Sequence, residues 1–227
     1  MLVRDWMNRE LVTVWADDSM ETAALKMKAH DVRLLPVLVK QDVLVGVVSD
    51  RDLKRASASD ATLLDVHELA YLLTQVKVKD IMTPRPVTIK WDFTVEEAAA
   101  LMLSRKISGL PVIGADEKLM GVITQNDVFR LLIALTGVGR RGIQFALEVA
   151  DHPGALQAVE EGIRDHGGRI ISILTTREGA THACRKVFVR AQEVRRAELP
   201  QLLDTLGRAG RLLYMVDHLE NRRQVFD

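Results

Sequence analysis

Apolar residues along the chain switch between two spacings, and these switches mark strands and helices. Within residues 78–136, helically spaced apolar positions follow a Thr94-x-x-Glu97 capping box, in which two side chains satisfy backbone amides at a helix start. Short apolar runs bounded by glycine or polar turns are typical of buried strands. The stretch therefore predicts a strand, a helix, two strands and a helix, at Pro86–Ile89, Thr94–Ile107, Leu110–Ile113, Met120–Thr124 and Asp127–Leu135.

The same pattern occurs earlier in the chain. A shift of about 75 residues aligns Val3–Arg55 with Val78–Arg130 without a gap, and roughly a third of the positions are identical. Leu35–Val37 falls on Leu110–Val112, for example. Each copy is predicted to be a β-α-β-β-α unit. Because a unit of about 55 residues is marginal alone, we expect the two copies to stack and bury each other's apolar faces.

After Gly142 the pattern changes. An alternating strand is followed by the turn Asp151–Gly154, and a helix with one apolar face ends at two glycines. The later runs predict two strands, a second helix and a last strand. The order is βαββαβ, which is a ferredoxin-like arrangement. The expected elements are Ile143–Val149, Ala155–His166, Arg169–Arg177, Arg185–Ala191, Glu198–Ala209 and Leu212–Val216.

These patterns divide the chain into five parts. We expect a first repeat, a linker with a turn at Ser57–Thr62 and an extra helix at His67–Gln75, a second repeat, a hinge rich in glycine and arginine, and a C-terminal domain. Their predicted bounds are residues 1–56, 57–77, 78–136, 137–142 and 143–220.

Composition narrows the class of protein. Apolar residues make up 48% of the chain, and 31 basic residues balance 31 acidic ones, so no cationic field gathers nucleic acid or an anionic membrane. A single cysteine, Cys184, cannot form an intrachain disulfide and fits a reducing compartment. No apolar run approaches the length of a membrane span. We therefore expect a cytoplasmic protein without nucleic-acid or membrane partners.

The duplicated half resembles a tandem pair of CBS domains, a Bateman module. The motif that carries the resemblance is a glycine, an apolar pair, Ser or Thr, and an Asp three residues on, present as Gly46–Asp52 and Gly121–Asp127. Residues 142–220 resemble an ACT domain through the βαββαβ order and the Asp151–Gly154 turn. Two CBS repeats followed by one ACT domain resemble acetoin-utilisation proteins of the AcuB type. The resemblance implies an α+β protein of two stacked CBS repeats and a ferredoxin-like ACT domain.

Two interpretations of the Ser/Thr–Asp turns stay open. Ser49 with Asp52, and Thr124 with Asp127, have the spacing of helix caps, which stabilise a helix by about 1 kcal/mol. The same geometry suits a nucleotide, because helix N-termini bind phosphate and a carboxylate accepts hydrogen bonds from a ribose diol. In CBS pairs the implied roles are phosphate binding for Ser or Thr and ribose binding for Asp. We expect an adenine nucleotide or S-adenosylmethionine here.

Two arginines accompany the first turn. Arg33 stands three residues before Pro36, where the second copy has Ser108 before Pro111. The resemblance places this position at the mouth of the ligand cleft, so Arg33 is a candidate phosphate donor, against the alternative of an exposed arginine on a turn. Arg51 is a weaker candidate of the same kind. The two sites should therefore differ in affinity for charged phosphates.

Other motifs do not support catalysis or metal binding. Residues 137–142 spell Gly-x-Gly-x-x-Gly, but a helix precedes and a strand follows, the reverse of the dinucleotide fingerprint. No histidines or cysteines have metal-ligand spacing, and no nucleophile with a base is evident. We therefore expect neither a metal nor catalytic residues.

In ACT domains the Asp151–Gly154 turn contacts a small ligand, usually an amino acid, at a subunit interface, so Asp151 and Gly154 are candidate ligand residues. The alternative is a structural turn in a domain used only for assembly. Together the sequence predicts a non-enzymatic homodimeric sensor with an unknown protein partner. The alternative is an interaction module whose sites are empty relics.

Overall fold

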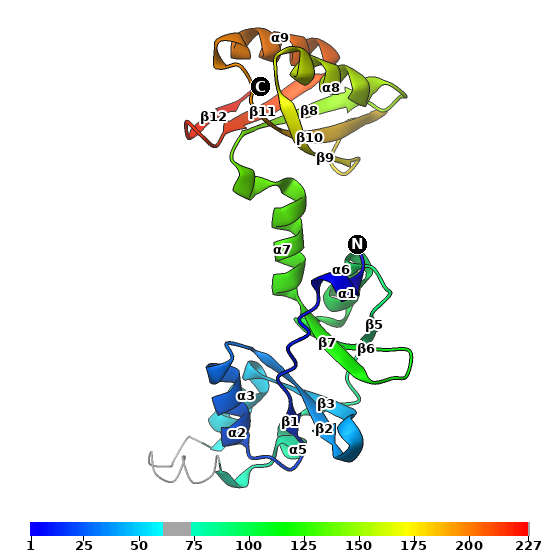
Figure 1. The fold of residues 1–227 in the computed structure, drawn as a ribbon, viewed down its shortest axis with the longest axis vertical. Coiled ribbons are helices and arrows are strands. Elements are labelled where there is room, and N and C mark those ends of the chain that lie inside the picture. The colour runs from blue at the N-terminus through cyan, green and yellow to red at the C-terminus, as the bar shows by residue number, and fades with distance from the viewer. Residues whose placement is uncertain (61–73, 227) are drawn as a thin grey trace. The chain divides into compact units, whose positions relative to one another are not determined.

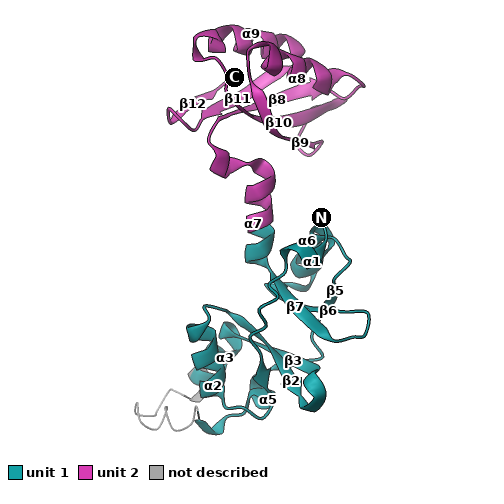
Figure 2. Ribbon diagram, in the orientation of Figure 1, with its two compact units in different colours: residues 1–129 teal, residues 130–227 magenta. Residues whose placement is uncertain are grey.

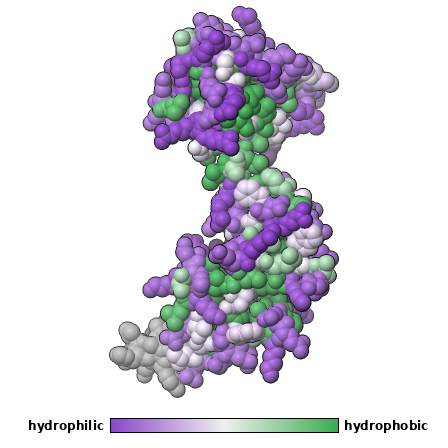
Figure 3. Space-filling model, viewed as in Figure 1, coloured by the Kyte–Doolittle hydropathy of each residue, from purple (hydrophilic) through white to green (hydrophobic). Residues whose placement is uncertain are grey.

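The computed structural model describes residues 1–60 and 74–226. The chain forms two compact units, and the boundary between Phe129 and Arg130 falls inside a helix (Figure 2). We call Met1–Phe129 the first unit and Arg130–Asp227 the second unit. No helix among the described residues is both long and apolar enough to cross a membrane. Hydrophilic side chains cover most of the surface that Figure 3 shows.

The first unit contains two small sheets that correspond to the two sequence repeats (Figure 1). In the first sheet, order β1-β2-β3-β4, the β1–β2 pairing is parallel and the others are antiparallel. Helices α2, α3 and α5 and the short 3-10 helix η1 accompany it. The bounds are β1 Val14–Trp15, α2 Met20–Ala29, β2 Leu34–Val39, η1 Lys40–Asp42, β3 Val43–Ser49, α3 Asp50–Asp60, α5 Val78–Ile81 and β4 Thr83–Pro84.

The second sheet repeats this plan. Its order is β5-β6-β7, with β5–β6 parallel and β6–β7 antiparallel. Thr94 and Glu97 form the predicted capping box at the start of α6. The bounds are α1 Val3–Trp6, β5 Ile89–Lys90, α6 Val95–Arg105, β6 Gly109–Ile113, β7 Leu119–Thr124 and α7 Gln125–Thr136.

Each repeat completes its sheet with a segment from the other repeat. At the N-terminus, the amide of Val3 donates to the carbonyl of Phe93 at 2.8 Å, and Asn8 bridges to Val122 of β7. Equivalently, the amide of Val78 donates to Asp18 at 2.9 Å, and Thr83 pairs with Val47 of β3. The first residues of each sequence repeat therefore pack against the sheet of the other repeat.

Two glycines of the motif make this exchange possible. A Cβ on Gly121 would lie 2.7 Å from Met7 Sδ and 2.8 Å from the carbonyl oxygen of Asn8. A Cβ on Gly46 would collide with the sulfur of Met82. The exchanged segments therefore sit on the sheet only because the last strand of each repeat carries glycine there.

The buried side chains of the first sheet are aliphatic residues and methionines from its strands and from one face of α2. Among them Val78, from the exchanged segment, is fully buried. Burial of this apolar surface is the main source of the free energy that stabilises the stacked repeats. The cluster comprises Val14, Ala16, Met20, Ala23, Met27, Leu35, Val37, Val48, Leu53 and Val78.

Three local predictions need correction. The turn expected from Ser57 is wrong as far as Asp60, because α3 continues to that residue. The strand expected at Pro86–Ile89 is shifted, since only Ile89–Lys90 pairs with β6. Most of the extra helix expected at His67–Gln75 lies outside the described residues.

The second unit is one antiparallel sheet with two helices on one face (Figure 1). The elements follow the order β8-α8-β9-β10-α9-β11, and the strand order across the sheet is β12-β11-β8-β10-β9. Fully buried side chains such as Phe145, Val189 and Leu206 fill the space between sheet and helices. The bounds are β8 Ile143–Ala150, α8 Ala155–Asp165, β9 Arg169–Thr176, β10 Cys184–Gln192, α9 Leu199–Ala209, β11 Arg211–Asp217 and β12 Arg222–Val225.

Residues 137–142, the predicted hinge, are hydrogen-bonded within the second unit. Gly137 adopts a left-handed conformation, φ +62°, that ends α7, and the short 3-10 helix η2, Val138–Arg140, follows. The last carbonyl of α7, on Thr136, accepts hydrogen bonds from Arg190 Nε at 2.8 Å and Ser172 Oγ at 3.1 Å. The end of α7 is thus attached to the second unit's sheet, and hinge motion stays a prediction.

Candidate functional site

The first Ser/Thr–Asp turn lies where β3 leads into α3. The amide N–H of Ser49 donates to Asp52 Oδ2 at 2.9 Å, and the Ser49 hydroxyl donates to the same oxygen at 2.6 Å. The amide of Asp52 in turn donates to Ser49 Oγ at 3.3 Å. The other carboxylate oxygen accepts a hydrogen bond from Arg55 at 2.7 Å. The turn is therefore a capping box with both carboxylate oxygens engaged.

The second turn, at the junction of β7 and α7, repeats the two bonds from the Ser or Thr residue to the aspartate. Thr124 N and Oγ1 donate to Asp127 Oδ2 at 2.8 Å and 2.6 Å. Asp127 is more enclosed than its counterpart, since only 3% of the residue is exposed while Asp52 is partly exposed. The structure thus confirms the capping interpretation at the first turn, and at the second turn it shows the bonds from Thr124 to the Asp127 carboxylate.

The residue just before β2 or β6 is hydrogen-bonded to the first residue of the helix that follows each turn. The amide of Asp50 donates to the carbonyl of Arg33 at 3.1 Å, and the amide of Gln125 donates to the carbonyl of Ser108 at 3.0 Å. These bonds bring Arg33 and Ser108 to equivalent places beside the two helix starts. The sequence register alone placed them there correctly, because the copies align without a gap.

The turns still offer groups that a ligand can bind. The Asp52 carboxylate accepts three hydrogen bonds and has about four acceptor sites, so one site is left for a ligand. At the second helix position, the N–H of Arg51 has no acceptor in the described part of the chain, and helix N-termini leave such donors for anions. The Ser49 and Thr124 hydroxyls, by contrast, already donate to aspartate, so phosphate binding through them requires the hydroxyl to rotate.

The two turns differ in charge. Arg33 and Arg51 are exposed, and neither side chain has an ion-pair or hydrogen-bond partner among residues 1–60 and 74–226. Their counterparts in the second copy are Ser108 and Asn126, which carry no charge. An anionic group beside the first turn therefore meets two guanidinium groups that have no counterpart at the equivalent positions of the second turn.

In the second unit, Asp151 is engaged in two ion pairs. Its carboxylate accepts hydrogen bonds from Arg177 Nε and Arg185 Nε, each at 2.6 Å. The hydrogen bond from Arg177, and then that from Arg185, lowers the pKa of Asp151, so the carboxylate stays charged. Gly154, at φ +90°, caps α8, and a Cβ there would meet nothing within 4 Å. The turn is open at Gly154, while the Asp151 carboxylate is already paired.

Within the described ranges, no group of three His, Cys, Asp or Glu side chains is placed to hold a metal ion. Cys184 is a free, partly buried thiol at the start of β10. Sequence reasoning missed two features. One is the contact of Asn8 and Thr83 with the last strand of the opposite repeat. The other is a pocket of about 330 Å³ in the second unit. No periodic signal marks either, because both join residues distant in sequence.

Comparison with known proteins identifies the family. A CBS-domain family model matches residues 3–59 and 78–134, together about half of the chain. A CBS domain-containing protein of Dictyostelium discoideum is 34% identical over 133 residues, covering 59% of this chain and 92% of that protein. An inosine-5'-monophosphate dehydrogenase of Korarchaeum cryptofilum is 37% identical over 121 residues, and the match spans 53% of this chain but 22% of the enzyme.

Two solved structures share the fold of the first part of the chain. The CBS domain pair of protein MJ0100, in complex with 5'-methylthioadenosine and S-adenosyl-L-methionine, is 26% identical with a TM-score of 0.50, covering 58% of this chain and 95% of that one. A Vibrio cholerae protein assigned to AcuB, acetoin utilization, is also 26% identical, with a TM-score of 0.51 over 62% of this chain and 96% of that one. Two matched repeats and the shared fold show that the chain belongs to the CBS-domain family.

Proposed function

We propose that this protein is a non-enzymatic regulator that binds an adenine nucleotide or an adenosyl derivative in its CBS pair. The observation that carries the proposal is the presence, in both repeats, of a Ser/Thr–Asp turn with the same hydrogen-bond geometry at a helix start. Support comes from the similar CBS pair of MJ0100, which is in complex with two adenosine derivatives. The part that resembles the dehydrogenase is about a fifth of that enzyme.

The ligand's sugar and phosphate would use different groups of the turn. Asp52 and Asp127 accept hydrogen bonds from the ribose diol, and Arg55, which is mostly exposed, can release Asp52 Oδ1 when the ribose arrives. A phosphate would pair with Arg33 and Arg51 and with the free amide at the second position of α3. The second site has no equivalent arginines, so it favours a ligand without phosphate.

The C-terminal unit is proposed to be an ACT domain. Its four strands β11-β8-β10-β9 are antiparallel, with both helices on one face, which is the ferredoxin-like arrangement. Because the Asp151 carboxylate is paired with arginines, a small amino acid at this turn would bind chiefly to backbone amides near Gly154. The same sheet would form the interface of a homodimer. The AcuB resemblance suggests a role in acetoin metabolism.

The mechanism would be linkage. A ligand that prefers one arrangement of the repeats stabilises it by its differential affinity, typically about 1–3 kcal/mol. Helix α7 begins at the Thr124–Asp127 turn and ends at Gly137, where it is bonded to the second unit's sheet. Ligand binding at the turn therefore acts on the chain segment that enters the second unit.

A different function is favoured by one observation. Both aspartates already satisfy their own helix caps, as they would in an assembly module that binds no ligand. Calorimetric titration of the full-length protein with AMP, ADP, ATP, S-adenosylmethionine and 5'-methylthioadenosine separates the two functions.

The titration includes Asp52→Asn and Asp127→Asn, with Asp50→Asn as the control because the Asp50 carboxylate pairs with the exposed Lys54, at 3.4 Å, and is not part of the Ser/Thr–Asp motif. We expect at least one adenosine compound to bind, and each site variant to weaken one site by about tenfold or more, since a charged hydrogen bond is lost. The Asp50 variant should bind normally. No binding of any compound, or equal binding by all variants, would favour the assembly module.

A further inference from the structure

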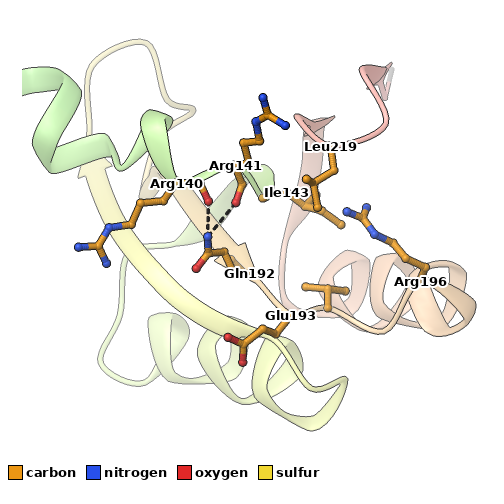
Figure 4. A pocket seen from close by; sticks show the side chains of 10 residues that line it. Arg140, Arg141, Ile143, Gln192, Glu193, Arg196 and Leu219 are labelled. Carbon is orange, nitrogen blue, oxygen red and sulfur yellow. Dashed lines mark hydrogen bonds between the residues drawn. The ribbon is translucent and has the colours of Figure 1, made fainter.

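The pocket of the second unit lies where β8 begins and β10 ends. It has a volume of about 330 Å³ and lies beside the residues that follow β11 (Figure 4). Its lining includes three arginines, Arg140, Arg141 and Arg196. Pockets of this size hold small molecules, so its chemistry indicates what it binds.

Two of these arginines have no ion-pair partner among residues 1–60 and 74–226. Arg140 and Arg141 are exposed, and no hydrogen bond or ion pair engages either guanidinium in the part of the chain that the structure describes. Arg196 pairs with the buried carboxylate of Asp217, at 3.1 Å from Oδ1. The one acidic residue in the lining, Glu193, faces Arg169 at 3.3 Å. The pocket therefore has a net positive charge that attracts an anion.

The backbone at the pocket is held in place. The side-chain amide of Gln192 donates to the carbonyl oxygens of Arg140 and, at 3.0 Å, Arg141. Arg141 and Glu193 both have left-handed backbones, with φ of +30° and +61°, which non-glycine residues rarely adopt. A Cβ on Gly142 would lie 2.5 Å from the carbonyl oxygen of Ala191, so the two chain segments meet closely. Such strained, well-bonded backbone is typical of binding sites.

The pocket also has an apolar side. Ile143, Val194 and Leu219 line it, and Leu219 is 59% exposed. In Figure 4 the guanidinium of Arg196 points toward Ile143 and Leu219, while those of Arg140 and Arg141 extend outward from the rim of the pocket. A ligand with one anionic group and a short aliphatic part would contact both sides.

We propose that this pocket binds a small anionic metabolite, a carboxylate or phosphate carried on a short aliphatic chain. The site shares no residue with the Ser/Thr–Asp turns or with the Asp151–Gly154 turn. Arg140 and Arg141 lie between the end of α7 at Thr136 and the start of β8 at Ile143, so an occupied pocket would restrain the segment that links the helix to β8. The pocket would thus give the protein a second input besides the adenosine ligand.

The test is an NMR titration of the uniformly ¹⁵N-labelled full-length protein with butyrate, inorganic phosphate and, as a neutral analogue, butanol. The reporters are the backbone amide of Gly142 and the side-chain amide of Gln192. We expect saturable shifts with butyrate or phosphate, and none with butanol. Saturation by butyrate alone identifies a carboxylate ligand, and saturation by phosphate alone identifies a phosphate ligand.

The double variant Arg140→Gln/Arg141→Gln should raise the dissociation constant of the anion by about tenfold or more, because two charge-assisted bonds are lost. Arg208→Gln, an exposed arginine of α9 outside the pocket, is the matched control and should bind normally. Equal binding by the double variant, or no saturable shift with either anion, would overturn the proposal. Neither result bears on the adenosine site, which is titrated separately.

Discussion

The two CBS repeats have the same local geometry but different surroundings. Both turns place an aspartate 2.6 Å from a Ser or Thr hydroxyl. Around the first, Arg33 and Arg51 are free and exposed, whereas the second has Ser108 and Asn126 and a more enclosed aspartate. Duplication thus preserved the backbone of the turn, while the side chains beside it diverged. The difference indicates two unequal sites.

The largest difference between the copies should come from their glycines. Gly121→Ala is expected to lower the free energy of unfolding by about 1–3 kcal/mol, because the new Cβ meets the backbone carbonyl of Asn8 at 2.8 Å. Gly46→Ala should cost less, since the carbonyl of Thr83 is 3.1 Å away and the nearer obstacle is a flexible methionine. Urea denaturation of both variants measures this. An equal loss would mean that the exchanged segments are not held as described.

The next largest difference should be the stability lost when each motif aspartate is replaced. Asp127→Ala is expected to cost about 1–2 kcal/mol of stability, because the Thr124 amide and hydroxyl lose their acceptor in an enclosed site. Asp52→Ala should cost about 0.5–1 kcal/mol, since water can reach the partly exposed first turn. Thermal unfolding of the two variants compares them directly. A larger loss at Asp52 would contradict the assigned burial.

Arg33 should determine how strongly the first turn prefers a ligand that carries a phosphate. Arg33→Ser gives the first turn the residue of the second, and we expect about five- to tenfold weaker binding of AMP with adenosine binding unchanged. Arg105→Ser, an exposed arginine of α6, is the control. Parallel titrations of AMP and adenosine provide the ratio. If Arg33→Ser weakens both ligands alike, Arg33 does not contact phosphate.

The smallest effect concerns the helix caps at α2 and α6. Hydrogen bonds from the Thr94 amide and hydroxyl lower the pKa of Glu97 from its ordinary 4.5, whereas the first copy has the uncharged Thr22 at this place. Because folding lowers this pKa, the stabilisation is complete above pH 4.5 and is lost as the pH falls through the lower folded value.

Glu97→Gln should therefore reduce the loss of stability between about pH 6 and about pH 3, since the amide still accepts the bonds without titrating. Glu21→Gln, the exposed acid at the start of α2, is the control and should leave the loss unchanged. Urea midpoints across this pH range provide the comparison. If Glu97→Gln loses as much stability at low pH as the unmodified protein, titration of Glu97 does not contribute to that loss.

Periodicity predicted the elements well where one face of an element is buried. The strands of the second unit and the end of α7 at Gly137 follow directly from apolar spacing and glycine punctuation. Strand β12 was missed, because Arg222–Val225 is almost wholly polar and pairs only at the sheet's edge. The turn expected from Ser57 was wrong, because small and polar residues there continue helix α3 to Asp60.

The candidate turns were predictable because the duplicated spacing marks them twice. The exchange of Val3–Asn8 and Val78–Thr83 was not, since aligned positions do not say which copy each segment packs against. The pairing of Asp151 with Arg177 and Arg185 was equally hidden, because it joins three loops and strands through tertiary contact.

The central claim is that the Ser/Thr–Asp turns bind the ribose of an adenosine ligand. A crystal structure of the full-length protein with 5'-methylthioadenosine tests it most directly. We expect the ribose hydroxyls within hydrogen-bond distance, about 2.7 Å, of the Asp52 or Asp127 carboxylate. A bound nucleoside whose ribose contacts neither aspartate would contradict the claim and leave both turns as helix caps alone.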